Sequence, residues 1–310
     1  MKRTLWVILG VILLIASITG LTWRSDLPAV ELMMKYTTPN SGWMMTGGQN
    51  IHFTDAGTGQ AILLIHGTGS SLHTWDGWNQ MLAGPYRVVR LDLPGFGLSG
   101  PQPQGDYSRE MYLTLFEDLR KALDIDRWTV VGNSFGGRLA GYYASDHPEV
   151  VSGLVLVNAS GWPKTESSWN IFDLAKGPAG SLISHCTPKF LIERTLHNVY
   201  ANDSLVSQDL IDRHYELLLF PGNRDALRDR LLEDYPDWTP ETVTSITCPT
   251  LFLWGTEDPW FPESDARAWF NAMPNATFKA IPNAGHLPME EVPVRTVAQF
   301  QPWHQMAIAP

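Results

Sequence analysis

The stretch Gly132-Asn133-Ser134-Phe135-Gly136-Gly137 decides the fold, because it directly follows the apolar run of residues 128–131 and precedes a helical pattern that extends to about residue 147. A short buried strand that leads into Gly-x-Ser-x-Gly and then into a helix predicts a sharp strand-to-helix turn. Such a turn holds its central residue in a strained backbone conformation, and the flanking glycines let strand and helix approach closely. We therefore expect Ser134 to project above a sheet edge at a helix N-terminus, where a serine can be a nucleophile.

A second signal lies upstream, where the apolar run of residues 61–65 ends in His66-Gly67-Thr68-Gly69. A continuous apolar run of this length is typical of a buried parallel strand. The glycine-rich turn leaves backbone N–H groups available, so we expect the N–H of Thr68 to join that of Phe135 in an oxyanion hole. An ordinary strand-to-loop turn is the alternative. His66 precedes Ser134 and sits at a strand end, which favours a structural, hydrogen-bonded histidine.

Two candidate functional residues lie downstream of the serine. Asp258 follows the apolar strand pattern of residues 249–255, and His286 follows that of residues 276–281. The carboxyl ends of parallel strands share one edge of a sheet, so residues far apart in sequence converge there. We therefore expect Ser134, Asp258 and His286 to meet at that edge.

Other acids and another base remain open at this point. Glu257 is the neighbour of Asp258 and its rival, and Asn158, after the strand pattern of residues 153–157, is a weaker one. Asp92 precedes the serine beside a Pro/Gly-punctuated loop, which favours a structural role. Of the other histidines only His304 follows the acid, but it lies near the C-terminus and follows no strand.

The ordered motifs resemble the α/β-hydrolase fold superfamily, in its monomeric-esterase, haloperoxidase-like and C–C-hydrolase branch. The resemblance covers roughly residue 46 to the C-terminus and rests on residues 66–67, 92–99, 132–137, 254–258 and 285–288. It implies hydrolase chemistry without a metal or an organic cofactor. It also implies that Ser134 is the nucleophile, that His286 is the general base and then the general acid, and that Asp258 orients His286.

The expected fold class is α/β, with a doubly wound, mostly parallel sheet and a helical cap insertion. An antiparallel hairpin around Gly47-Gly48 should open the sheet, and Ser108 should cap a helix that extends to residue 123. The strand rhythm stops after Gly161. The expected parts are residues 1–24 as a transmembrane signal anchor, 25–45 as a juxtamembrane tether with a short amphipathic part, 46–161 and 246–310 as the hydrolase core, and 162–245 as the cap.

Residues 5–23 form a run without any charged side chain. The length of this run suits a single membrane-spanning helix. Trp6 and Trp23 lie near its ends, where aromatic rings favour the membrane interface. Lys2 and Arg3 predict a cytoplasmic N-terminus and a catalytic domain outside, in the periplasm or the extracellular space. The alternative is a signal peptide that is cleaved, with secretion of the rest.

Aromatic residues are frequent in and near the expected cap. Any one of them is more commonly part of a core, because large aromatics dominate core burial. Collectively they suggest a pocket for an apolar acyl or aromatic small molecule. The candidates for the pocket wall are Trp162, Trp169 and Trp260.

Composition limits the function classes. The 310 residues carry a net charge of −10, which argues against nucleic acid as a partner, and a hydrophobic content of 44%, which is typical of a globular protein. Cys186 and Cys248 lack the spacing of metal ligands, and the sequence leaves open whether they form a disulfide.

The expected function is that of a membrane-anchored serine hydrolase, which cleaves carboxylic esters or related acyl compounds through an acyl-enzyme. Hydrolysis of a C–C bond in ring-cleavage products by the same triad is the alternative, although residues 67–71 lack the Gly-Pro-Gly ending common in that group. A non-catalytic binding protein of this fold is disfavoured, because such proteins usually lose a triad residue.

Overall fold

The computed structural model describes Trp6, Gly20, Lys176, Gly177 and Gly180 together with residues 23–163 and 184–308. Its centre is an eight-stranded sheet with the strand order β1-β2-β4-β3-β5-β6-β7-β8. The strands are β1 Ser41–Thr46, β2 Gln49–Gly57, β3 Gln60–Ile65, β4 Tyr86–Leu91, β5 Trp128–Asn133, β6 Val151–Val157, β7 Thr250–Gly255 and β8 Ala276–Ile281.

The sheet is mostly parallel, as expected. Strands β1 and β2 form the predicted antiparallel hairpin, β2 also pairs with β4 in antiparallel fashion, and the remaining pairs are parallel. Every residue of β5 and β7 is buried, which explains their uninterrupted apolar sequences, because helices cover both faces of a parallel sheet.

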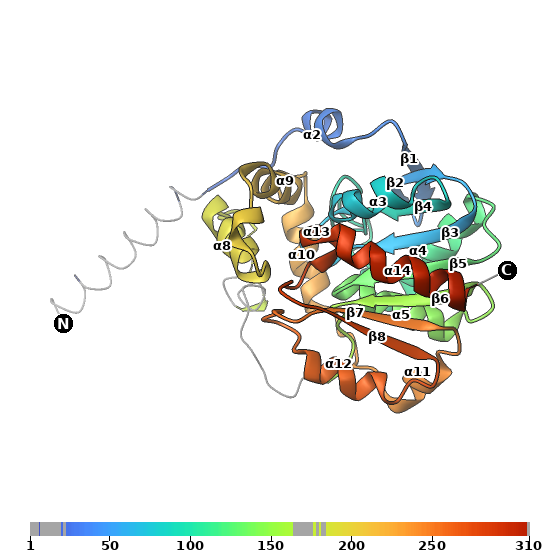
Figure 1. Ribbon diagram of the computed structural model, residues 1–310. Coiled ribbons are helices and arrows are strands. Elements are labelled where there is room, and N and C mark those ends of the chain that lie inside the picture. The colour runs from blue at the N-terminus through green and yellow to red at the C-terminus, as the bar shows by residue number, and fades with distance from the viewer. Residues whose placement is uncertain are drawn as a thin grey trace.

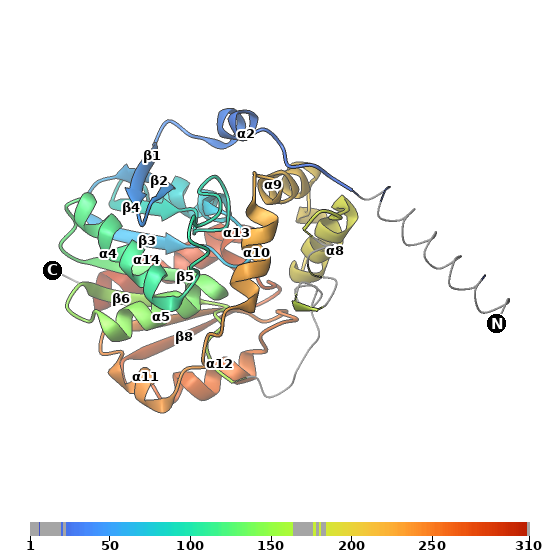
Figure 2. The ribbon, with the colours of Figure 1, turned by 180° about the vertical axis from the view of Figure 1, so that it is seen from behind.

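Helices form a layer on each face of the sheet (Figures 1 and 2). One face carries α3 (Asp76–Leu82) and α14 (Pro293–Ala307), and the opposite face carries α4 (Arg109–Ala122), α5 (Phe135–Asp146) and α12 (Glu263–Phe270). The hydroxyl of Ser108 accepts a hydrogen bond from the backbone N–H of Met111 at 3.3 Å, so the predicted N-cap of α4 is present.

The chain direction across the sheet reverses at β3, which pairs with β4 on one side and with β5 on the other. The loops that follow these strands therefore run in opposite directions at the carboxyl edge of the sheet. A crevice is expected between them, as in other doubly wound sheets. The loop after β3 carries Thr68, and the turn after β5 carries Ser134.

The insertion between β6 and β7 contributes helices α8 (Lys189–Val199), α9 (Gln208–Leu218), α10 (Asn223–Leu232) and α11 (Pro240–Ser245). Helices α8 to α10 gather at one end of the sheet (Figure 2). The end of the insertion behaves differently, because Trp238 is fully buried against Gly141 and Gly161 of the core. Its backbone N–H donates to the carbonyl of Gly161. The last part of the expected cap, with α11, therefore packs on the core.

The stretch expected as a tether is docked on the rest of the chain instead of hanging free. Helix α2 (Ala29–Tyr36) supplies the expected amphipathic part, and it buries Leu32 and Tyr36. The Tyr36 hydroxyl donates to Glu216 of α9 at 2.8 Å. Upstream of α2, Asp26 pairs with Arg224 of α10 at 2.6 Å. The last residues of the expected tether belong to β1.

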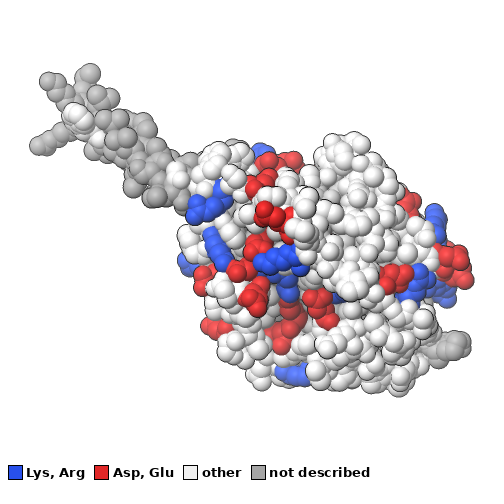
Figure 3. Space-filling model, turned by 90° about the horizontal axis from the view of Figure 1, so that it is seen from above, with Lys and Arg blue, Asp and Glu red and all other residues white. Residues whose placement is uncertain are grey.

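The predicted anchor lies outside the described residues, apart from Trp6, Gly20 and Trp23. In the part of the chain that the structure describes, no helix combines the length and the apolar character that crossing a membrane requires. Cys186 and Cys248 are not joined in a disulfide. On the face shown in Figure 3, acidic and basic side chains are interspersed rather than gathered by sign.

Candidate active site

Ser134 stands at the strained turn between β5 and α5, with φ 52° and ψ −119°. The flanking glycines explain why the turn is so tight. A Cβ on Gly132 would lie 2.2 Å from the carbonyl oxygen of Gly136, and a Cβ on Gly136 would lie 2.5 Å from that of His66. Neither position admits a side chain, so β5, α5 and the loop after β3 meet at van der Waals distance around the serine.

Asp258 and His286 lie next to each other at the same edge. Nδ1 of His286 is 2.8 Å from Oδ2 of Asp258, and both side chains are almost fully buried. The other carboxylate oxygen of Asp258 accepts the backbone N–H groups of Trp260 at 2.8 Å and Phe261 at 3.2 Å. Asn158 donates from Nδ2 to Oδ2 at 2.7 Å. These donors hold the carboxylate in place against Nδ1, at one edge of the imidazole ring.

The position of His286 is fixed by the core and by the cap together. The side-chain amide of Asn133, next to the serine, donates to the backbone carbonyl of His286 at 3.0 Å. The backbone N–H of His286 donates to Val199 at the end of α8, at 2.8 Å. The ring stacks on Phe261, with 5.4 Å between centroids. With Nδ1 held by Asp258, Nε2 is the ring nitrogen left for proton transfer.

Two cavities share Ser134, Thr68 and Trp260 in their walls. One cavity, of 140 Å³, also contains His286 and is lined mostly by apolar side chains of the cap, among them Leu191, Ile192, Leu196, Val199, Leu218 and Leu227. The other, of 310 Å³, is more polar and contains Phe135, Arg138, Ser160, Arg230, Glu233, Asp234 and Tyr235. Ser134 is therefore placed where an apolar compartment meets a polar one.

The backbone N–H groups of Thr68 and Phe135 are available beside the serine. In the described part of the chain, neither donates a hydrogen bond to another protein atom. The cap supports the loop that carries Thr68, because Arg230 of α10 donates to the Thr68 hydroxyl at 2.9 Å. Nδ1 of His214 in α9 lies 3.2 Å from the Gly69 carbonyl oxygen, on the same loop.

His66 has the structural role expected for it. Its Nδ1 donates to the carbonyl of Gly67 at 2.7 Å, and its Nε2 accepts the backbone N–H of Leu93 at 3.0 Å. Burial lowers the pKa of this imidazole, which favours the neutral ring that both hydrogen bonds require. Asp92 is structural as well, because it accepts the backbone N–H groups of Leu72 and Leu98 and contacts His52.

Two of the three rival residues make their contacts away from His286, and the third is a donor at the site. Glu257 is exposed, and its carboxylate contacts the neighbouring Thr256 hydroxyl. Nε2 of His304 is 2.9 Å from the Thr129 hydroxyl, inside the core. Asn158 is at the site as a donor to Asp258 rather than as the acid. The sequence shows that Asn158 directly follows β6, but it does not show that Asn158 contacts Asp258.

The three aromatic candidates for the pocket wall differ in where the structure places them. Trp260 lines both cavities. Trp162 does not face either of these cavities: it is fully buried in the core and stacks on Phe252 and Trp269, so the expectation for it was wrong. Trp162 comes shortly after β6 in the chain, and its ring lies on the face of the sheet that α12 covers. Trp169 lies outside the described residues.

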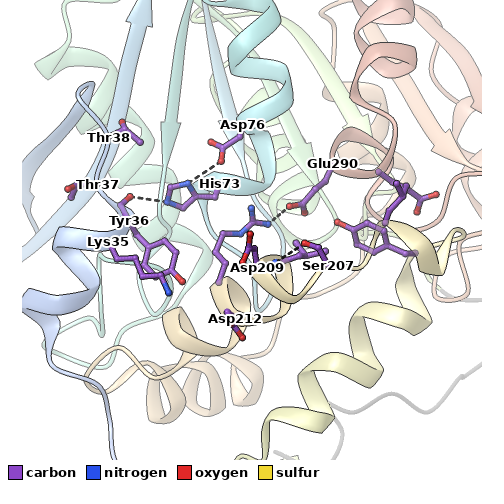
Figure 4. A pocket seen from close by; sticks show the side chains of 15 residues that line it. Lys35, Tyr36, Thr37, Thr38, His73, Asp76, Ser207, Asp209, Asp212 and Glu290 are labelled. Carbon is purple, nitrogen blue, oxygen red and sulfur yellow. Dashed lines mark hydrogen bonds and ion pairs between the residues drawn. The ribbon is translucent and has the colours of Figure 1, made fainter.

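A larger cavity, of 660 Å³, lies away from Ser134, between α2, α9 and the start of α3. Some of its charged side chains pair with one another, as Figure 4 shows for His73 with Asp76. Glu290 accepts a hydrogen bond from Arg213. Size alone therefore does not identify the site of chemistry. Within the described residues, no group of three or more His, Cys, Asp and Glu side chains is arranged to hold a metal ion.

Comparisons with known proteins agree with this fold. A family model described as "Alpha/beta hydrolase family" matches residues 62–300. An uncharacterized protein of Mycobacterium bovis is 33% identical over 260 residues, which cover 79% of this chain and 75% of that protein. A 2-hydroxymuconate semialdehyde hydrolase of a Pseudomonas species is 28% identical over 249 residues, which cover 76% of this chain and 83% of the hydrolase.

A solved structure that covers the whole chain is also similar. It is the crystal structure of a membrane phospholipase A, described as a bacterial virulence factor, with a TM-score of 0.76, 26% identity and 100% of both chains covered. Fold, family model and hydrolase relatives agree. The chain belongs to the alpha/beta hydrolase family and is an enzyme of the hydrolase class.

Proposed function

We propose that the protein is a membrane-anchored serine hydrolase that cleaves carboxylic esters or related acyl compounds through an acyl-enzyme. The observation that carries the proposal is the buried Asp258–His286 pair, 2.8 Å apart, together with a cavity whose wall contains both His286 and Ser134, the latter at a strained strand-to-helix turn. This arrangement supplies a nucleophile, a base and an orienting acid without any other group.

The reaction divides these residues into roles. His286 Nε2 takes the proton of the Ser134 hydroxyl while Oγ attacks the ester carbonyl, and Asp258 stabilises the imidazolium that forms. The N–H groups of Thr68 and Phe135 stabilise the oxyanion of the tetrahedral intermediate. Its collapse breaks the ester C–O bond, and His286 returns the proton to the leaving alcohol. Water, activated by the same histidine, then hydrolyses the acyl-enzyme and frees Ser134.

The apolar cavity supports an acyl chain as its occupant, because its wall is formed mainly by aliphatic side chains of α8 and α9. Its volume of 140 Å³ favours short chains over long ones. The likeness to a membrane phospholipase A, which extends over the full length of both chains, supports ester substrates and an anchored enzyme. The uncharged run of residues 5–23 is the proposed anchor, with the catalytic domain outside the cytoplasm.

Cleavage of a C–C bond is the second candidate, and the 28% identity to a 2-hydroxymuconate semialdehyde hydrolase is the observation that favours it. A substrate screen separates the two. Wild type and Ser134→Ala are assayed with p-nitrophenyl esters of graded chain length and with 2-hydroxymuconate semialdehyde. The proposal expects hydrolysis of the short esters by the wild type alone. Turnover of the semialdehyde without turnover of any ester would replace the ester proposal by the C–C one.

The anchor is tested separately, by fractionation. The full-length chain should sediment with membranes and resist a high-salt wash, whereas a chain that starts at Ser25 should be released and should keep its esterase activity. Recovery of the full-length product as a soluble protein with a new N-terminus near residue 21 would show cleavage of a signal peptide instead.

A further inference from the structure

Arg230 of α10 is a buried cation in the wall of the polar cavity. Only 6% of the residue is exposed to solvent. One guanidinium nitrogen donates to the Thr68 hydroxyl at 2.9 Å, and the guanidinium lies over the ring of Phe135 at 4.5 Å. Its Nε is buried without any hydrogen-bond partner. The guanidinium therefore lies among the residues that surround Ser134, with donor capacity left over.

No carboxylate of the described residues forms an ion pair with Arg230. The groups that act on it electrostatically are Tyr112, Tyr235 and Arg138, none of them a carboxylate. The other charged residues in the wall of this cavity are differently placed. Arg138 pairs with Asp237 at 2.9 Å, whereas Lys176, Glu233 and Asp234 are exposed to solvent.

A buried charge without a counter-ion is costly to the folded state, and replacing it by an apolar side chain commonly stabilises a protein. The Thr68 hydroxyl and the ring faces of Phe135 and Phe96, the latter at 6.0 Å, offset only part of that cost. The chain keeps this charge beside Ser134 with no counter-ion among the described residues, so a counter-ion is best supplied by the substrate. Arginine is also suited to the role, because its fork matches the oxygens of phosphate and carboxylate groups.

We propose that Arg230 is a specificity-determining residue. It binds an anionic group, either a phosphate or a carboxylate, on the alcohol portion of the ester. The inference rests on the proposed function at Ser134 and names its substrate class. The two cavities then divide one substrate between them. The acyl chain occupies the 140 Å³ apolar cavity, the scissile carbonyl lies at Ser134, and the anionic alcohol extends into the 310 Å³ polar cavity towards Arg230.

Matched butyryl esters test the proposal. 1-Butyrylglycerol 3-phosphate, O-butyrylglycolate and neutral 1-butyrylglycerol present a phosphate, a carboxylate and no charge on the alcohol side. In the wild type, at least one anionic ester should exceed the neutral ester in kcat/KM, and the two anionic arms tell which group is preferred. Arg230→Met should lower kcat/KM for the preferred anionic ester by about 10- to 100-fold relative to the neutral ester, as expected for lost hydrogen bonds between charged groups. Any loss common to both esters reports the support that Arg230 gives to the Thr68 loop.

Three further variants keep the result interpretable. Arg138→Met removes a cation of the same cavity that is already paired with Asp237, so the anionic-to-neutral ratio should change less than about threefold. Arg230→Lys should restore part of the preference, because it keeps the charge without the fork. Thr68→Val keeps the backbone N–H but removes the hydroxyl that Arg230 contacts, and the preference should survive. Thermal melts should show Arg230→Met to be folded and no less stable than the wild type.

Binding to the Ser134→Ala protein separates this inference from the proposed function, because it needs no turnover. Calorimetric titration with 1-butyrylglycerol 3-phosphate and with O-butyrylglycolate should show at least about tenfold weaker binding of the preferred ester when Arg230→Met is added. Equal treatment of anionic and neutral esters by the wild type would overturn the inference while leaving ester hydrolysis intact. An equal loss on all three esters in Arg230→Met, reproduced by Thr68→Val, would show that Arg230 acts only by positioning the oxyanion loop. Tight, Arg230-dependent binding without hydrolysis of any ester would reject the proposed function alone.

Discussion

The carboxyl edge of the sheet and the cap above it hold their polar side chains in different ways. At the edge, Asp258 accepts two backbone N–H groups and a side-chain amide, and it is paired with His286. In the cap, Arg230 is buried with a hydroxyl as its hydrogen-bond partner and, as far as the structure describes the chain, without a carboxylate beside it. The Asp258–His286 pair at the edge has its hydrogen-bond partners within the protein, as a catalytic group requires. The cap, in contrast, contains a buried cation that a substrate anion can pair with. Variants at the edge should therefore abolish turnover, and variants in the cap should redirect it.

The largest effect is expected at the edge. Ser134→Ala and His286→Ala should each lower kcat by about 10⁴- to 10⁶-fold, because members of a catalytic triad act as a unit. The double variant should be no worse than either single variant. Steady-state assays with p-nitrophenyl butyrate check this, together with circular dichroism to confirm that both proteins fold. Multiplicative losses in the double variant would mean that the two residues do not act together.

The two neighbouring carboxylates offer a matched pair. Asp258→Asn should keep the hydrogen-bonded position but favour the wrong imidazole tautomer, with a loss that approaches ~10⁴-fold in kcat. Glu257→Gln should stay within about twofold of the wild type, because Glu257 is exposed and contacts Thr256 rather than His286. If Glu257→Gln abolished activity while Asp258→Asn retained most of it, the acid would be misassigned.

Two tryptophans separate packing from substrate contact. Trp162→Ala should lower the free energy of unfolding by about 3–5 kcal/mol, because it removes a fully buried ring from the core. Trp260→Ala should lower the free energy of unfolding by only about 1 kcal/mol, because Trp260 is partly exposed. It should raise KM instead, because Trp260 lines both cavities. Urea titrations and KM values check the pair. A KM effect at Trp162 without loss of stability would place that ring in the pocket after all.

The smallest effect is one of pH on stability. Burial lowers the pKa of His304 to about 4, whereas an unfolded histidine titrates near 6.5. Between these values the unfolded chain binds a proton that the native chain does not, so stability should fall as the pH decreases from 6.5 to 4. The contribution of His304 to this slope is about 1.4 kcal/mol per pH unit. Urea midpoints between pH 7 and pH 5 should fall less steeply for His304→Gln, and an unchanged slope would contradict the assignment.

The sequence predicted the edge better than the cap for a physical reason. Buried parallel strands require continuous apolar runs, and the residue after each run must lie at the common edge, as Ser134, Asp258 and His286 do. An aromatic after such a run gives no such information, because Trp162 is placed by contacts with Phe252 and Trp269, far along the chain.

Helix α10 shows the same limit for charged residues. Arg224 and Arg230 are both buried in one short helix, yet Arg224 pairs with Asp26 from the N-terminal part of the chain and Arg230 faces the cavity. Nothing in the local sequence separates them. The docking of α2 on Glu216 is equally a property of the folded chain, since the two partners are distant in sequence.

Labelling of the nucleophile tests the central claim most directly. A fluorophosphonate should modify the wild-type protein once, and peptide mass spectrometry should place the adduct on Ser134, because the reagent requires a serine activated by an adjacent base. Asp258→Asn should slow the labelling, whereas Glu257→Gln should leave its rate unchanged. An adduct on another residue, or labelling that persists in Ser134→Ala, would contradict the account.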